Sequence, residues 1–229
     1  MKTAILIDGA FYRKQADELF GEKTASERAW ELFIYCMKHL EKGKESRELY
    51  RIFYYDCPPL KKNIYHPLLK KDINFEQSEL CSWMNRFLQE LTTKRKLALR
   101  LGRLSEQASY TLRPSVVKDL MDKKISLEDL EEKHFMLDVK QKGVDMRIGL
   151  DISSMAFKKQ VDQIILIAGD SDFVPAAKQA RREGIDFILD PMNNHINPDL
   201  NEHVDGIESH YKEIQQEDKE RKSKKALHK

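Results

Sequence analysis

The 229-residue sequence has no long hydrophobic run and little cysteine. No apolar stretch approaches the roughly 18 residues that a membrane-spanning helix needs. The opening MKTAILIDGA has too short an apolar core for a secretory signal, and an aspartate follows that core directly. We therefore expect a cytoplasmic protein that does not enter a membrane.

The three cysteines are odd in number and far apart in the sequence. They form no CxxC pair and no Cys/His cluster, so neither disulfide bridges nor a structural zinc site is expected. We expect buried free thiols at Cys36, Cys57 and Cys81.

Motifs of several common enzyme classes are also missing. None of the seven histidines has HExxH or paired spacing, so none is assigned to a metal or to catalysis. The sequence has no Ser/His/Asp or Cys/His nucleophilic motif. It also lacks a GxxxxGKS/T phosphate-binding loop, which argues against a nucleotide-driven motor.

Neither sign of charge is in large excess. The chain has 40 basic and 38 acidic residues, a formal net charge of +2. This balance neither demands nor excludes nucleic acid, so the local distribution of charge matters more. With 41% hydrophobic and 34% charged residues, the composition is that of a globular protein with a heavily charged surface.

Strand-like apolar runs alternate with segments of helical periodicity over most of the chain. The run IILIA at 164–168 is apolar throughout, which is typical of a strand covered on both faces. This alternation predicts an α/β fold with a mainly parallel central sheet and helices on both faces. Strands are predicted at 3–8, 49–55, 97–101, 164–168 and 185–189, and helices at 27–42, 75–92, 143–155 and 174–183.

We predict one domain over residues 1–210, elaborated by a mostly helical insertion near 103–140. The insertion has polar clusters, one proline and short apolar patches. Residues 211–229 are charged and basic and lack apolar periodicity at their end, so we expect a disordered tail.

Several aspartates are predicted to meet at one edge of the sheet. Asp8 ends the first strand, and Asp170 and Asp172 follow the strand at 164–168. The carboxyl ends of parallel strands form the rim where ligands bind. Asp145 lies at the start of the helix before that strand, which brings a fourth carboxylate near the same rim.

Carboxylates packed this closely repel and raise one another's pKa. A hard divalent cation such as Mg²⁺ or Mn²⁺ would relieve the repulsion, because both prefer oxygen ligands. Sites of this kind commonly activate water in phosphodiester hydrolysis.

Local roles are the alternative for each aspartate taken alone. Ser171 or Asp172 could serve only to cap the helix that starts near Phe173. Asp8 and Gly9 could form an ordinary turn. The convergence of three or four aspartates at one rim is what favours a metal site.

At these residues the sequence resembles the NYN family of PIN-like ribonucleases, particularly its LabA-like branch. The segment GDSDFVP with the upstream KGVD is the most specific part of the resemblance. The pieces frame about residues 2–210. They are ILIDGAFYRK at 5–14, RLGRL at 100–104, KGVDMRIGLDI at 142–152, ILIAGDSDFVPAAKQARREGI at 165–185 and HVDGI at 203–207.

The resemblance implies a PIN-like fold and an acidic, Mg²⁺- or Mn²⁺-dependent site that cleaves RNA. Asp151 matches a further family aspartate and is kept as a secondary metal-ligand candidate, because six residues after Asp145 a straight helix turns it to a different face. Many NYN proteins carry Asn in an IDGxN pattern, where this chain has Ala10 and Phe11. The family's acidic positions fall on Asp8, Asp145, Asp170 and Asp172.

Basic side chains are the candidates for holding RNA phosphates. Arg13 and Lys14 follow Asp8 and are expected near the rim, where Phe11 could stack on a base or belong to the core. The preferred grip brackets the strand at 97–101, although such residues can equally form a solvated face. It consists of Lys94, Arg95, Lys96, Arg100 and Arg103.

These observations favour a metal-dependent endoribonuclease. The first alternative is a catalytically inactive NYN module that binds RNA or a protein partner. The second is a phosphatase with Asp8 as nucleophile, which the sequence DGA disfavours because such enzymes usually show DxD at the first strand. The oligomeric state, whether alone or as a homo-oligomer, is left open.

Overall fold

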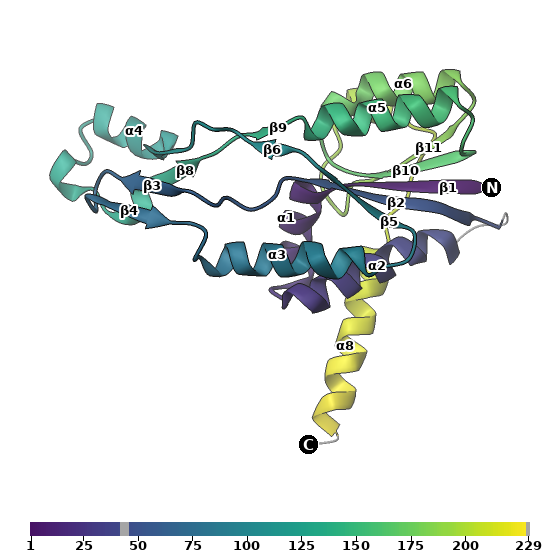
Figure 1. The fold of residues 1–229 in the computed structure, drawn as a ribbon, viewed down its shortest axis with the longest axis horizontal. Coiled ribbons are helices and arrows are strands. Elements are labelled where there is room, and N and C mark those ends of the chain that lie inside the picture. The colour runs from purple at the N-terminus through teal and green to yellow at the C-terminus, as the bar shows by residue number, and fades with distance from the viewer. Residues whose placement is uncertain (42–45, 228–229) are drawn as a thin grey trace.

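A computed structural model describes residues 1–41 and 46–227, and its centre is a six-stranded sheet (Figure 1). The strand order is β12-β11-β10-β1-β2-β5, and all neighbouring pairs are parallel. The predicted α/β fold with a parallel sheet is confirmed. The strands are β1 (Lys2–Asp8), β2 (Glu48–Asp56), β5 (Leu97–Leu101), β10 (Gln163–Ile167), β11 (Asp186–Asp190) and β12 (Gly206–Ile207).

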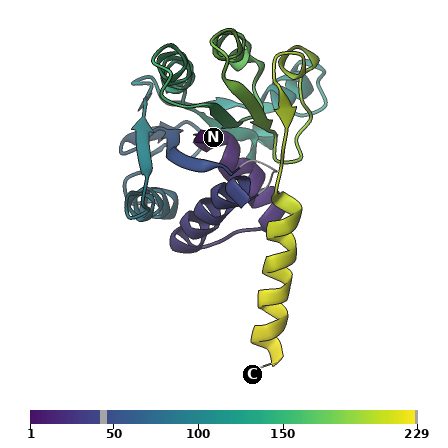
Figure 2. The same cartoon turned by 90° about the vertical axis from the view of Figure 1, so that its right-hand side faces the viewer.

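Helices cover both faces of the sheet (Figures 1 and 2). Successive side chains of a strand point to opposite faces, so β1 places Leu6 in one core and Ile7 in the other. One core is closed by α5 (Val144–Phe157) and α6 (Val174–Arg182). The other is closed by α1 (Gly9–Phe20), α2 (Ala25–Glu41) and α3 (Glu79–Thr92).

The insertion predicted as mostly helical near 103–140 is only partly so, and that prediction is corrected. It holds a single α-helix, α4 (Pro114–Met121), with two 3₁₀ turns at Leu127–Asp129 and Glu132–His134. The rest pairs as short antiparallel ladders. These ladders join β6 (Arg103–Leu104) to β9 (Gln141–Lys142) and β7 (Ser109–Leu112) to β8 (Phe135–Asp138).

A hairpin of β3 (Asn63–His66) and β4 (Lys71–Asn74) packs against this insertion. The ring of His66 lies 4.2 Å from that of Tyr110 and 5.2 Å from that of Phe135, measured between centroids. Together residues 63–74 and 103–142 form an arm that extends from the sheet (Figure 1).

The tail predicted as disordered over 211–229 is instead a helix, α8 (Tyr211–Leu227), which projects from the body (Figure 2). Its first half is anchored through ion pairs and one buried side chain, Ile214. Lys38 Nζ lies 3.0 Å from Glu217, and Lys23 pairs with Asp218. Because the helix is held by ion pairs and one buried side chain, its apolar residues do not repeat at helical spacing. The hydrophobic pattern of the sequence therefore gave no sign of it. Residues 228 and 229 lie outside the described residues.

Two general expectations can be compared with the structure. Cys36, Cys57 and Cys81 are free and buried. Within the described ranges, no helix combines the length and apolarity needed to cross a membrane.

Gly9 lies where α1 starts against β2, and the space beside it is closed. A Cβ on Gly9 would lie 2.5 Å from Tyr54 Cζ and 2.6 Å from the backbone oxygen of Tyr55. Backbone cannot move aside as a flexible side chain can. The glycine of the DG pair is therefore required by the packing of α1 on the sheet.

We expect Gly9→Ala to lower the free energy of unfolding by about 1–3 kcal/mol, the usual cost of overpacking. Urea unfolding followed by circular dichroism measures this. Gly149→Ala is the matched control, because its Cβ would meet only Ala176 Cβ at 4.0 Å. That helical substitution should be neutral or stabilising. Equal stability of Gly9→Ala and wild type would contradict the packing argument.

Candidate active site

The crevice between the carboxyl ends of β1 and β10 is where the connections of the sheet diverge. After β1 the chain enters α1 on one face, and after β10 it enters α6 on the other. Ligands of open α/β sheets bind at such switch points. Because Ile7 pairs with Ile167, Asp8 lies beside the segment that follows β10.

Asp8 fixes the start of α1 and also faces this crevice. Its Oδ1 accepts hydrogen bonds from the backbone N–H groups of Ala10 at 3.1 Å and Phe11 at 3.2 Å. Burial raises the pKa of Asp8 above its usual value, and the negative charge of Asp145 raises it further. Asp8 therefore caps α1 with Oδ1 and also belongs to the candidate site.

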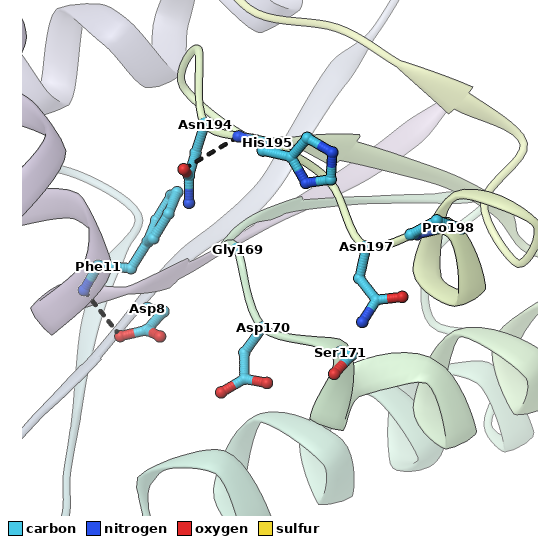
Figure 3. Close-up of a pocket in the computed structure, with 9 residues that line it drawn as sticks. All are labelled: Asp8, Phe11, Gly169, Asp170, Ser171, Asn194, His195, Asn197 and Pro198. Atoms are coloured by element: carbon cyan, nitrogen blue, oxygen red, sulfur yellow. Dashed lines mark hydrogen bonds between the residues drawn. The ribbon is translucent and has the colours of Figure 1, made fainter.

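Asp170 and Asp172 lie across the crevice, on the turn that leads into α6. Asp170 Oδ1 accepts a hydrogen bond from the Asp172 backbone N–H at 3.0 Å and caps the 3₁₀ turn Ser171–Phe173. The helix α6 itself has no side-chain cap. The alternative in which Ser171 or Asp172 caps that helix is therefore wrong. Figure 3 shows Asp8 and Asp170 directed into the same pocket.

Asp145 joins the group from the first turn of α5, after Gly143 with its left-handed φ of 77°. Its pKa is raised by burial and by the negative charges of Asp170 and Asp172. Asp145 therefore lies close enough to interact with Asp8 on one side of the crevice and with Asp170 and Asp172 on the other. We call Asp8, Asp145, Asp170 and Asp172 the aspartate quartet.

The donors of the quartet fit a hard divalent cation. Across residues 1–41 and 46–227, no basic side chain forms an ion pair with Asp145, Asp170 or Asp172. No three quartet aspartates bring oxygens within 4.8 Å of one another, as expected of carboxylates that repel. An all-oxygen set of this kind suits Mg²⁺ or Mn²⁺.

Asp151 lies apart from the quartet. It accepts a hydrogen bond from the Tyr55 hydroxyl at 2.8 Å and pairs with Arg100 Nε at 3.0 Å. Its spacing from Asp145 predicted a different helix face, and both of its partners belong to β2 and β5. Asp151 therefore binds the helix to the sheet.

The basic residues predicted as one grip are divided between the two ends of β5. Lys94 lies 5.3 Å from the centre of the Trp30 ring, and the Lys96 ammonium donates to the backbone oxygen of Leu49. Lys94, Arg95 and Lys96 precede β5 and so lie at its amino end, opposite the crevice. Any contact of these three with RNA would therefore lie away from the crevice.

The remaining predicted basic residues differ in whether they form ion pairs. Arg13 forms an ion pair with the buried Asp56, and Arg100 is held by Asp151. Lys14 on α1 and Arg103 at the root of the arm are exposed. Within the described part of the chain, neither of these two forms an ion pair.

Sequence reasoning missed the loop between β11 and α7 (Pro198–Asn201), which forms the other wall. Asn194, His195 and Asn197 line a pocket of about 510 Å³ with Asp8 and Asp170 (Figure 3). The available signal was the polar run after the strand at 185–189, because that strand ends at the same edge.

Phe11 and Gly169 shape the floor of this pocket. A Cβ on Gly169 would lie 2.5 Å from Phe11 Cε2 and 3.0 Å from Asn194 Nδ2. Glycine thus lets the strand end pass close under the Phe11 ring. Phe11 lines the pocket rather than lying wholly in the core.

A family model described as the NYN domain matches residues 62–205. The matched range includes Asp145, Asp170 and Asp172, whereas Asp8 lies before it. The chain is also similar to a crystal structure of a protein of unknown function from Vibrio parahaemolyticus, with 16% identity, a TM-score of 0.45 and 90% of each chain covered. No curated protein matches the chain.

We expect Asp145→Asn to raise the melting temperature in EDTA, because it removes the repulsion from Asp170 and Asp172. Mg²⁺ should raise the melting temperature of the wild type by mass action, and should raise that of the variant much less. Differential scanning fluorimetry measures both. Asp119→Asn, on the exposed arm, is the control for loss of a charge. An equal Mg²⁺ response in all three proteins would show that the quartet does not bind the ion.

Proposed function

This chain belongs to the NYN domain family, and on that premise we propose that it is a divalent-cation-dependent endoribonuclease. NYN domains are generally nucleases with a PIN-like fold. The observation that carries the proposal is the convergence of the aspartate quartet in the crevice between β1 and β10. We also propose membership of the LabA-like branch, from GDSDFVP at 169–175 and KGVD at 142–145.

The quartet would hold one or two Mg²⁺ or Mn²⁺ ions. When bound, such an ion lowers the pKa of water and offsets charge on the phosphate oxygens. The chain itself supplies orientation. One oxygen each of Asp8 and Asp170 is fixed by backbone N–H groups, so these carboxylates are set before the substrate arrives.

The wall of the crevice supports a nucleic-acid substrate. The amides of Asn194 and Asn197 can donate to phosphate oxygens or pair with base edges and 2′-hydroxyls, which distinguish RNA from DNA. The Phe11 ring offers a face for base stacking. Lys14 and Arg103 supply positive charge beside the site.

A pure binding module would not need four carboxylates that repel the phosphate backbone. The observation that favours a non-catalytic NYN module which binds RNA or a protein is Phe11 in place of the family's Asn.

We place the protein in the cytoplasm, where three buried thiols stay reduced.

The test uses a circular single-stranded RNA, which only an endonuclease can open, and a DNA circle of the same sequence. We expect the wild type to cleave the RNA with Mn²⁺ or Mg²⁺ and to stop in EDTA. The rate of RNA cleavage by Asp170→Asn should fall by about 10- to 100-fold or more, because the substitution weakens metal ligation.

Asp119→Asn, purified identically, should keep full activity and exposes any contaminating ribonuclease. Wild type that binds the RNA without cutting it would establish the binding module instead. Equal cleavage by Asp170→Asn would place the active centre elsewhere.

A further inference from the structure

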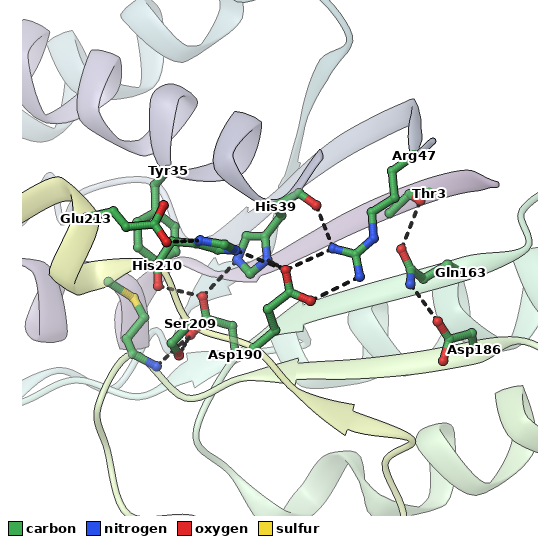
Figure 4. A network of polar contacts seen from close by, with 12 residues as sticks. Thr3, Tyr35, His39, Arg47, Gln163, Asp186, Asp190, Ser209, His210 and Glu213 are labelled. Atoms are coloured by element: carbon green, nitrogen blue, oxygen red, sulfur yellow. Dashed lines mark hydrogen bonds and ion pairs between the residues drawn. The ribbon is translucent and has the colours of Figure 1, made fainter. Parts of the chain in front are cut away.

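His39 and His210 lie together on the α2 face of the sheet (Figure 4), and Glu208 lies within reach of both. His39 comes from α2, and Glu208 and His210 come from the segment between β12 and α8. One potential ligand atom from each lies within 4.8 Å of the other two. Both imidazoles are buried, with exposures of 0% and 1%. The proposed nuclease function uses none of these residues.

Each imidazole is held from behind by a carboxylate. His39 Nε2 lies 2.9 Å from Asp190 Oδ2, and His210 Nδ1 lies 3.2 Å from Glu213 Oε1. Histidines that bind metals almost always donate their second N–H group to such a partner, which fixes the tautomer. The opposite nitrogens, His39 Nδ1 and His210 Nε2, are thereby directed towards one place.

Glu208 shares that place. Its Oε1 lies 3.0 Å from His210 Nε2 and 3.9 Å from His39 Nδ1. The longer distance is not a hydrogen bond, and within the described part of the chain His39 Nδ1 has no hydrogen-bond partner. A fully buried ring nitrogen without a partner is costly. A ligand bound between the three side chains would satisfy it.

The charge of the cluster favours a cation. Asp190, Glu208 and Glu213 are three carboxylates, and among the described Lys and Arg residues only Arg47 pairs with one of them, its Nη1 and Nη2 lying 2.9 and 3.0 Å from the two Glu208 oxygens. With neutral imidazoles, three negative charges against one positive leave two negative charges. A divalent ion would balance them.

We propose that His39, Glu208 and His210 form a Zn²⁺ site. Two imidazoles and one carboxylate are ligands that Zn²⁺ takes readily, whereas Mg²⁺ prefers oxygen alone. The ion fastens the start of α8 to α2, next to the end of β11. Its role is structural, and it is separate from the aspartate quartet in both ligands and location.

The experiment uses the untagged full chain, stripped with EDTA and dialysed. Isothermal titration with Zn²⁺ in excess Mg²⁺, which occupies the quartet, should give one Zn²⁺ per chain, and Zn²⁺ should raise the melting temperature further. His39→Gln and His210→Gln should weaken binding by about 100-fold or more. Asp170→Asn and His203→Gln should bind as the wild type does. The second control tests the exposed group Asp199, Glu202 and His203.

Circular dichroism of each metal-free variant shows whether it is folded. If a buried histidine variant does not fold, Glu208→Gln takes its place, because this glutamate is partly exposed and glutamine keeps its shape. Absence of Zn²⁺ binding to the wild type would overturn the proposal. So would binding that survives the folded cluster variants, or binding that is lost in His203→Gln.

Discussion

Repulsion between carboxylates at the ends of β1 and β10 is the constraint around which this structure is arranged. Parallel pairing of β1 and β10 places Asp8 beside the turn that holds Asp170 and Asp172, and the first turn of α5 adds Asp145. The extensive apolar cores on both faces of the sheet offset this local cost. A site that destabilises its own fold in this way is common where function requires it.

Two clusters of opposite chemistry lie at different places on the same sheet. The quartet offers only oxygens, and three of its members, Asp145, Asp170 and Asp172, are exposed and form no ion pair within the described residues. The second cluster offers two imidazoles, is buried, and is braced by carboxylates behind each ring. On our proposals the aspartate quartet serves catalysis, and the cluster of His39, Glu208 and His210 fastens the C-terminal helix. The different ligand types of the two clusters favour different metal ions.

Most core elements could be predicted from the sequence because apolar runs and helical periods are long there, but α1 was not among the predicted helices. The quartet followed from the rule that parallel strands end at one rim and from the family resemblance. The arm could not be read, because four-residue strands such as β7 and β8 depend on distant pairing. The cluster around His39 and Glu208 could not be predicted either, because these residues lie far apart in the sequence and meet only in the folded chain. Lys94 precedes β5 and so lies at the edge of the sheet opposite the crevice, which the prediction of one basic cluster around that strand did not consider.

The most direct test of the central claim is a crystal structure with Mn²⁺, with anomalous scattering used to locate the ion. The account predicts anomalous density in the crevice, within direct coordination distance of carboxylates from both Asp145 and Asp170. Density absent from the crevice at saturating Mn²⁺, or present only beside His39 and His210, would contradict it.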